Sequence, residues 1–236
     1  MLYANGQGVS RNIDLAIKFS CEIEVQAAAE KEGRVDHLLA LRDHPGANPF
    51  DLCDDVTSGM MVGFCEGRDS ELAEQARKGK ITSLLTGATA AQQAAFDKLK
   101  SAGETYFGEH ADSTLGTGGT MRAAEEIMVT EGQRTVFVET LTQFEKREQP
   151  EGMSGDFAEA DRALNDIYRQ LLAWADPDVG TTQQDLRHAE RAWIAYRDRW
   201  LDFAKLRYPD LPADKIKTLL TRQRIAAIDK TLHPGH

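Results

Sequence analysis

Apolar residues recur every three or four positions along most of the chain, which is the spacing of amphipathic helices. In the C-terminal third, one such stripe comprises Phe157, Ala160, Leu164, Ile167, Leu171 and Trp174. A second stripe comprises Leu186, Ala189, Trp193, Tyr196, Trp200 and Phe203. Strand-like alternation of apolar and polar residues is scarce. The pattern predicts an all-α protein in which both stripes are buried.

Further helices are predicted on both sides of these stripes. A last helix is expected from about Ala213 to Leu232, with Pro212 suited to its first turn and Pro234-Gly235 after its end. In the middle of the chain, Thr89 can cap a helix that carries Ala95, Leu99, Ala102 and Tyr106. After the flexible "STLGTGG", another helix carries Ala124, Ile127, Val138 and Leu141.

The two halves of the helical region resemble each other. "RDSEL" at 68–72 aligns with "ADRAL" at 160–164, Leu99 with Trp193, and Tyr106 with Trp200. The sequence therefore predicts a helical bundle made of two degenerate copies of one helical unit, at 49–148 and 155–236, preceded by a short helix-turn segment at 1–48. The linker between the copies is expected at 147–155, where proline, glycine and charged residues interrupt the stripes.

The charge of the chain narrows the range of partners. The 38 acidic residues exceed the 28 basic ones, which gives a net charge of -10. Nucleic acids and anionic membranes bind basic surfaces, so the composition argues against both and favours a basic protein partner. Solubility alone is an equally good explanation of the acidity. The sequence also lacks an apolar run long enough to cross a bilayer.

Spacings that would indicate catalysis or metal binding are absent from the sequence. The histidines (His37, His44, His110, His188, His233, His236) form neither an H-E-x-x-H helix nor a site with a cysteine pair, and "HPGH" at the end is better explained as a frayed terminus. "GTGG" at 116–119 lacks the Lys-Ser or Lys-Thr of a phosphate loop. Acidic residues such as Asp54 and Asp55 are common near helix starts. We therefore expect no enzyme and no cofactor.

Arg197 is the most informative polar residue of the second stripe. It lies one helical turn from Trp193 and Leu201, so part of its side chain should be shielded from water and need acceptors. Asp161, Glu190 or a carbonyl at a helix end can supply them. We predict a buried polar clamp that fixes helix register, in preference to a ligand site. The clamp would comprise Asp161, Asn165, Tyr168, Glu190 and Arg197, beside an aromatic seam of Trp193, Tyr196 and Trp200.

Two motifs in this region resemble a known family. "ADRALNDIYRQLL" (160–172) followed by "LRHAERAWIAYRDRW" (186–200) is similar to the LprI-type N-terminal domain, a bacterial cell-envelope domain associated in some members with lysozyme inhibition. "CDDVTSGMMVGFC" (53–65) also resembles the leading segment of that family, displaced here by about a hundred residues. The resemblance implies an exported, periplasmic binding protein.

The family often has a cysteine shortly after "RD", where this chain has Arg199 and Trp200, which leaves the cysteine pairing open. The chain has three cysteines, Cys21, Cys53 and Cys65. The preferred disulfide is Cys53 with Cys65, which requires the chain near Cys53 to fold back. Cys21 with Cys53 is the alternative.

The first residues resemble a different family. "LYANGQGVSRNIDLAIKF" is similar to the turn and second helix of a Sel-one-like repeat, with Ser10 as the expected helix cap. Because a turn joins two elements, we expect a first helix upstream of Met1, together with an export signal.

Three functional hypotheses follow. The first is a non-enzymatic periplasmic protein of inhibitor or immunity type that binds a lysozyme-like cell-wall hydrolase or a delivered toxin, and its acidic surface suits a basic target. The second is a Sel-one-like scaffold or adaptor for protein assembly. The third, an unrecognised enzyme, would require a deep pocket with converging titratable groups.

Overall fold

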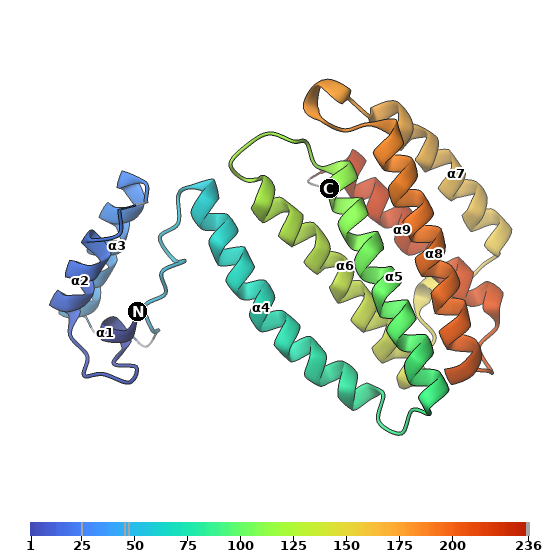
Figure 1. Cartoon of the computed structure of the whole chain (residues 1–236), viewed down its shortest axis with the longest axis horizontal. Coiled ribbons are helices and arrows are strands. Elements are labelled where there is room, and N and C mark those ends of the chain that lie inside the picture. The colour runs from blue at the N-terminus through green and yellow to red at the C-terminus, as the bar shows by residue number, and fades with distance from the viewer. Residues whose placement is uncertain (25, 45, 47, 235–236) are drawn as a thin grey trace. The chain divides into compact units, whose positions relative to one another are not determined.

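A computed structural model describes residues 1–24, 26–44, 46 and 48–234 (Figure 1). Over these ranges the regular elements are helices, which confirms the predicted all-α class. The α-helices are α1 (Leu2–Asn5), α2 (Ile13–Cys21), α3 (Ala28–Asp43), α4 (Gly59–Leu84), α5 (Ala90–Thr114), α6 (Arg122–Glu145), α7 (Phe157–Trp174), α8 (Gln183–Arg207) and α9 (Ala213–Leu232). Two short 3-10 helices, η1 (Glu151–Met153) and η2 (Pro177–Val179), flank α7.

The chain forms two compact units. The first comprises Met1–Asp69 with Gly119–Glu125, and the second comprises Ser70–Gly118 with Glu126–His236. Helix α4 contributes residues to both. These units are defined by contacts and divide the chain at positions other than the predicted domain boundaries. The domains at 1–48, 49–148 and 155–236 stay a prediction.

The first unit is built on the pair of helices α2 and α3. Its small core consists of Ala4, Ala16, Leu38 and Phe50. Asn12, rather than the expected Ser10, caps α2, because its side chain accepts a hydrogen bond of 3.0 Å from the backbone N–H of Leu15. The helix-turn arrangement is compatible with the Sel-one-like resemblance, which remains a prediction.

A buried acidic residue of α3 holds the segment that leads into α4. The Glu30 carboxylate accepts hydrogen bonds from the backbone N–H groups of Thr57 and Ser58, at 3.0 and 2.6 Å. Burial opposes ionisation of Glu30, but the hydrogen bonds from Ser58 and Thr57 outweigh it and lower the pKa of the carboxyl group. The side chain of Arg34 is also fully buried, 3.8 Å from Glu30. Residues after position 48 are therefore tied to the helix-turn segment before it.

A disulfide closes the same region. Cys53 and Cys65 are bonded, with their Cα atoms 5.9 Å apart, and Cys21 is free and exposed. The chain folds back through the turn before α4, as the preferred pairing required. Beside this disulfide, Asp51 accepts a hydrogen bond of 2.6 Å from Arg68 of α4.

Removing the disulfide should loosen this part of the chain. Replacing both Cys53 and Cys65 with serine is expected to destabilise the first unit by about 2–3 kcal/mol, because the bond restricts the unfolded loop. Hydrogen exchange should show faster opening of residues 48–69, with Cys21→Ser as the matched control. Unchanged protection of this segment in the double variant would contradict the prediction.

The second unit is a bundle in which α5 packs along α8, and α7 packs against α9 (Figure 1). Helix α6 contributes Phe137, Val138, Leu141 and Phe144 to the core. The helix starts follow the expected chemistry: Thr89 and Gln92 form a capping box on α5, and Thr182 caps α8. Pro212 lies at the N-cap of α9.

The first predicted stripe is not buried along its whole length: Phe157 and Ile167 are half-buried, and one member is exposed. Ala160, Leu164 and Leu171 of α7 are buried, but Trp174 at the end of the helix is 38% exposed. The chain leaves α7 immediately after Trp174 and turns through η2, so the indole ring stays at the surface. The expectation that Trp174 lies in the core is therefore wrong.

Candidate functional site

The aromatic seam of α8 lies inside the second unit. Trp193, Tyr196 and Trp200 are 3%, 5% and 0% exposed. Tyr196 stacks on Tyr106 of α5, with ring centroids 5.5 Å apart. Trp200 contacts Phe137 of α6, also at 5.5 Å. The seam joins three helices of the bundle through aromatic pairs.

The close approach of α5 and α8 depends on a small residue opposite the seam. A Cβ atom at Gly103 would lie 3.3 Å from the ring of Tyr196 and 3.3 Å from that of Phe107. Both rings belong to the core and have little room to move. The absence of a side chain at Gly103 therefore leaves room for the rings of Tyr196 and Phe107.

A buried arginine of α9 forms the polar clamp of this bundle. The Nε atom of Arg224 donates to Glu190 of α8 at 3.0 Å, and its Nη2 atom lies 2.9 Å from the same carboxylate oxygen. Its Nη1 atom donates to the Tyr106 hydroxyl at 3.2 Å and lies 3.2 Å from Nδ1 of His110. Arg224 is 1% exposed, so these contacts replace water around its charge. The clamp connects α5, α8 and α9.

The protonation states of the clamp follow from its burial. Burial and the neighbouring charge of Arg224 lower the pKa of His110 to about 3, so the imidazole is neutral. Burial raises the pKa of Tyr106, which keeps its hydroxyl protonated. Burial alone would lower the pKa of Arg224, but Tyr106 and Glu190 raise it above its usual range. A single charged pair, Arg224 with Glu190, thus sits among neutral partners.

The prediction that Arg197 is the clamp arginine is wrong. Arg197 donates to its neighbour Asp198 at 3.1 and 2.9 Å, and its guanidinium lies 5.4 Å from the ring centroid of Trp193. The Arg197 side chain lies at the edge of the aromatic seam, so it pairs with the exposed carboxylate of Asp198. The acceptor Glu190 faces α9 and is taken by Arg224.

Of the other residues predicted for the clamp, only Tyr168 lies near Glu190. Asp161 and Asn165 lie on the exposed side of α7, where the Asn165 amide donates to the Asp161 carbonyl at 2.8 Å. Tyr168 is half-buried, and burial and the charge of Glu190 raise its pKa. The structure therefore brings Tyr168 near Glu190 and leaves Asp161 and Asn165 outside the clamp.

Other residues considered for chemistry have structural partners. His37 lies 3.0 Å from Asp55, and Asp54 accepts from the backbone of Asp51. His233 pairs with Asp229, whereas His236 lies outside the described residues. Within the described ranges, no group of three or more histidine, cysteine or acidic residues has the arrangement of a metal site. In the same ranges, no helix is both long enough and apolar enough to cross a membrane.

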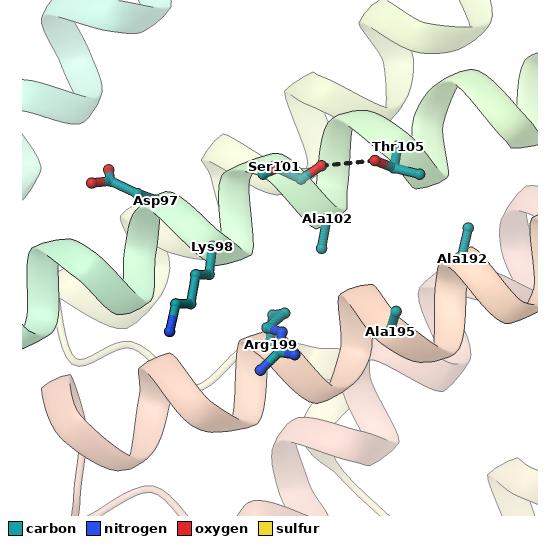
Figure 2. A pocket seen from close by; sticks show the side chains of 8 residues that line it. All are labelled: Asp97, Lys98, Ser101, Ala102, Thr105, Ala192, Ala195 and Arg199. Carbon is teal, nitrogen blue, oxygen red and sulfur yellow. Dashed lines mark hydrogen bonds between the residues drawn. The ribbon is translucent and has the colours of Figure 1, made fainter.

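A shallow groove of about 610 Å³ runs along the outer side of the α5–α8 pair (Figure 2). Ala102, Ala192 and Ala195 form its apolar floor. Lys98 extends from α5 and Arg199 from α8 (Figure 2), and Arg199 forms an ion pair with Asp202 at 2.7 Å. Its small side chains and shallow form make the groove a surface for contact.

Comparison with known proteins identifies one family. Residues 145–228, about a third of the chain, match the family described as Lysozyme inhibitor LprI. The match covers α7, α8 and most of α9 and confirms the resemblance found in the two motifs of that region. No curated protein and no solved structure matches the chain. The predicted first copy at 49–148 lies almost wholly outside the matched residues, so the duplication stays a prediction.

Proposed function

We propose that this protein is a non-enzymatic periplasmic protein of inhibitor or immunity type that binds a lysozyme-like cell-wall hydrolase. The observation that carries the proposal is the match of residues 145–228 to a lysozyme inhibitor family. That segment contributes the α8 seam and the Arg224 clamp, and its interior is filled by aromatic packing. Its outer surface is therefore the part available to a partner.

The charge of the chain supports a basic target. A net charge of -10 attracts a cationic protein and raises the rate of encounter at low salt. Lysozyme-like hydrolases with a basic surface meet this requirement. A delivered toxin with a basic surface is the other class of target that the same argument allows.

The ionisable groups of the second unit support a binding role. Glu190 and Arg224 neutralise each other, and Glu145 accepts hydrogen bonds from both Arg207 and Tyr208. Burial is outweighed at Glu145 by the hydrogen bonds from Arg207 and Tyr208, which lower its pKa and keep it ionised. Groups held in such pairs hold helices together, because each charge is already neutralised by its partner inside the bundle.

The proposal predicts direct inhibition. The protein is mixed with c-type, g-type and bacterial muramidases, and the clearing of a peptidoglycan suspension is followed. At least one basic muramidase should lose most of its activity when the protein is in excess, and the inhibition should weaken with added salt.

A heat-denatured sample and an acidic helical protein of similar size serve as controls for non-specific charge effects. Full activity of every muramidase in the panel would contradict the proposal. Clearing of peptidoglycan by the protein alone would contradict its non-enzymatic character.

A further inference from the structure

The turn between α7 and α8 exposes two apolar side chains close together in the sequence. Trp174 is 38% exposed and Val179 is 53% exposed, although both are apolar. Asp176, Pro177 and Asp178 lie between them in the sequence and are exposed as well. We name residues 174–179 the α7–α8 tip. Exposed tryptophan is a residue type that often dominates the energy of protein interfaces.

The tip has a fixed shape because hydrogen bonds close its base. The backbone N–H groups of Val179 and Thr181 donate to the Asp176 carbonyl at 3.2 and 3.0 Å. The Asp176 carboxylate accepts from the backbone N–H of Asp178 at 2.9 Å. Thr181, which is 1% exposed, accepts from the Asp176 N–H at 2.8 Å. The side chains of Asp178 and Val179 therefore project from an ordered turn.

The loop that follows α5 contacts the backbone of the tip. The backbone N–H of Thr117 donates to the Val179 carbonyl at 3.0 Å. A Cβ atom at Gly116 would lie 2.8 Å from the same oxygen. Gly180 has a φ of +90°, and a Cβ atom there would lie 2.5 Å from the Thr117 side chain. Gly116 and Thr117 thus form the support of the tip, and only glycine at 116 and 180 permits the contact.

The Asp178 carboxylate of the tip is available for a partner. Among the ion pairs of the described residues, none involves Asp176 or Asp178. By contrast, the exposed carboxylates of Asp166, Asp198 and Asp202 are each paired with an arginine. The tip therefore combines a free negative charge with apolar side chains on a rigid support.

We propose that the α7–α8 tip is the element that contacts the inhibited enzyme, with Trp174 and Val179 entering a concave surface of a basic cell-wall hydrolase and Asp178 facing its cationic rim. This inference rests on the proposed function and names the contact face. A rigid apolar projection loses little conformational entropy on binding, which favours affinity. The free carboxylate complements a cationic cleft and opposes an anionic one.

Charge reversal at the tip is the first test. Asp178→Lys should weaken inhibition of the most strongly inhibited muramidase of the panel by about 10-fold or more, because attraction becomes repulsion. Asp210→Lys is the matched control, since Asp210 is an exposed loop carboxylate of the same unit between α8 and α9. The control should change the inhibition constant by less than about 3-fold.

Truncation of the apolar groups is the second test. Val179→Ser and Trp174→Ser should each weaken inhibition roughly 10-fold, because both side chains would lose apolar contact with the enzyme. Thermal unfolding of each variant, measured alongside, should show that the bundle is still folded at the assay temperature. Ile194→Ser is the control, because Ile194 is 39% exposed on α8, outside the tip.

The outcomes separate this inference from the proposed function. Loss of inhibition in the tip variants, with both controls intact, supports the tip as the contact face. Full inhibition by the tip variants would overturn the tip while the inhibitor function stands. A wild-type protein that inhibits no muramidase would overturn both.

Discussion

Replacing Arg224 with alanine is expected to lower the free energy of unfolding by about 3–5 kcal/mol, the usual effect of removing one member of a buried ion pair. The substitution leaves Glu190 without its cation and removes the donor to the Tyr106 hydroxyl. It also empties the volume of a side chain that is 1% exposed. Urea unfolding followed by circular dichroism measures the change.

The matched control for this variant is Arg197→Ala. Arg197 pairs with a neighbouring residue, Asp198, whose side chain is 55% exposed, and covers one face of Trp193. Such contacts contribute less than about 1 kcal/mol. Equal destabilisation by the two alanine variants would contradict the assignment of the clamp to Arg224.

Acidification is expected to destabilise the second unit well before its carboxylates titrate. The pKa of His110 is about 3 in the folded protein, against 6.5 for the free side chain. Between these values the unfolded chain binds one more proton than the folded one, so stability is lost as the pH falls. The loss is about 1.4 kcal/mol per pH unit, or roughly 3 kcal/mol between pH 7 and pH 4.

The measurement compares unfolding of the wild type with that of His110→Gln across this pH range. Glutamine keeps an acceptor for Arg224 but cannot take up a proton. Carboxylates with lowered pKa values, such as Glu131 and Glu145, remain in both proteins and begin to lose their contribution as the pH falls below their ordinary value of 4.5. The wild type should therefore show the steeper loss of stability from pH 6.5 downward. Parallel curves would show that His110 is not the group responsible.

The seam of the bundle was accessible to sequence reasoning because its signal is periodic. Trp193, Tyr196 and Trp200 recur at three and four residues, and such spacing places side chains on one face whatever covers it. The family motifs are concentrated in the same helices, which is why the resemblance and the burial pattern agree.

The polar clamp could not be assigned in the same way. Arg197 and Arg224 both flank apolar stripes, and burial depends on which helix covers each of them. One signal was present for Arg224: it lies at a spacing of four between Leu220 and Ile228, both buried on α9. Its partner His110 is a lone histidine on the buried face of α5, a position typical of a neutral side chain.

The exposure of the α7–α8 tip could not be predicted from the spacing of apolar residues. Trp174 continues the spacing of Leu164 and Leu171, but η2 follows directly and nothing in the pattern indicates where the chain turns. The role of Gly116 and Gly180 also depends on a contact between two loops about sixty residues apart, which local sequence does not encode.

We propose above that the outer surface of this bundle blocks a cell-wall hydrolase by binding alone. Titrating a fixed, high concentration of a sensitive muramidase with the protein tests this claim most directly. The account predicts that activity falls linearly to zero at one equivalent and that intact protein is recovered from the complex. Undiminished activity at several equivalents would contradict the account, as would complete inactivation by a small fraction of an equivalent, which would indicate catalytic turnover.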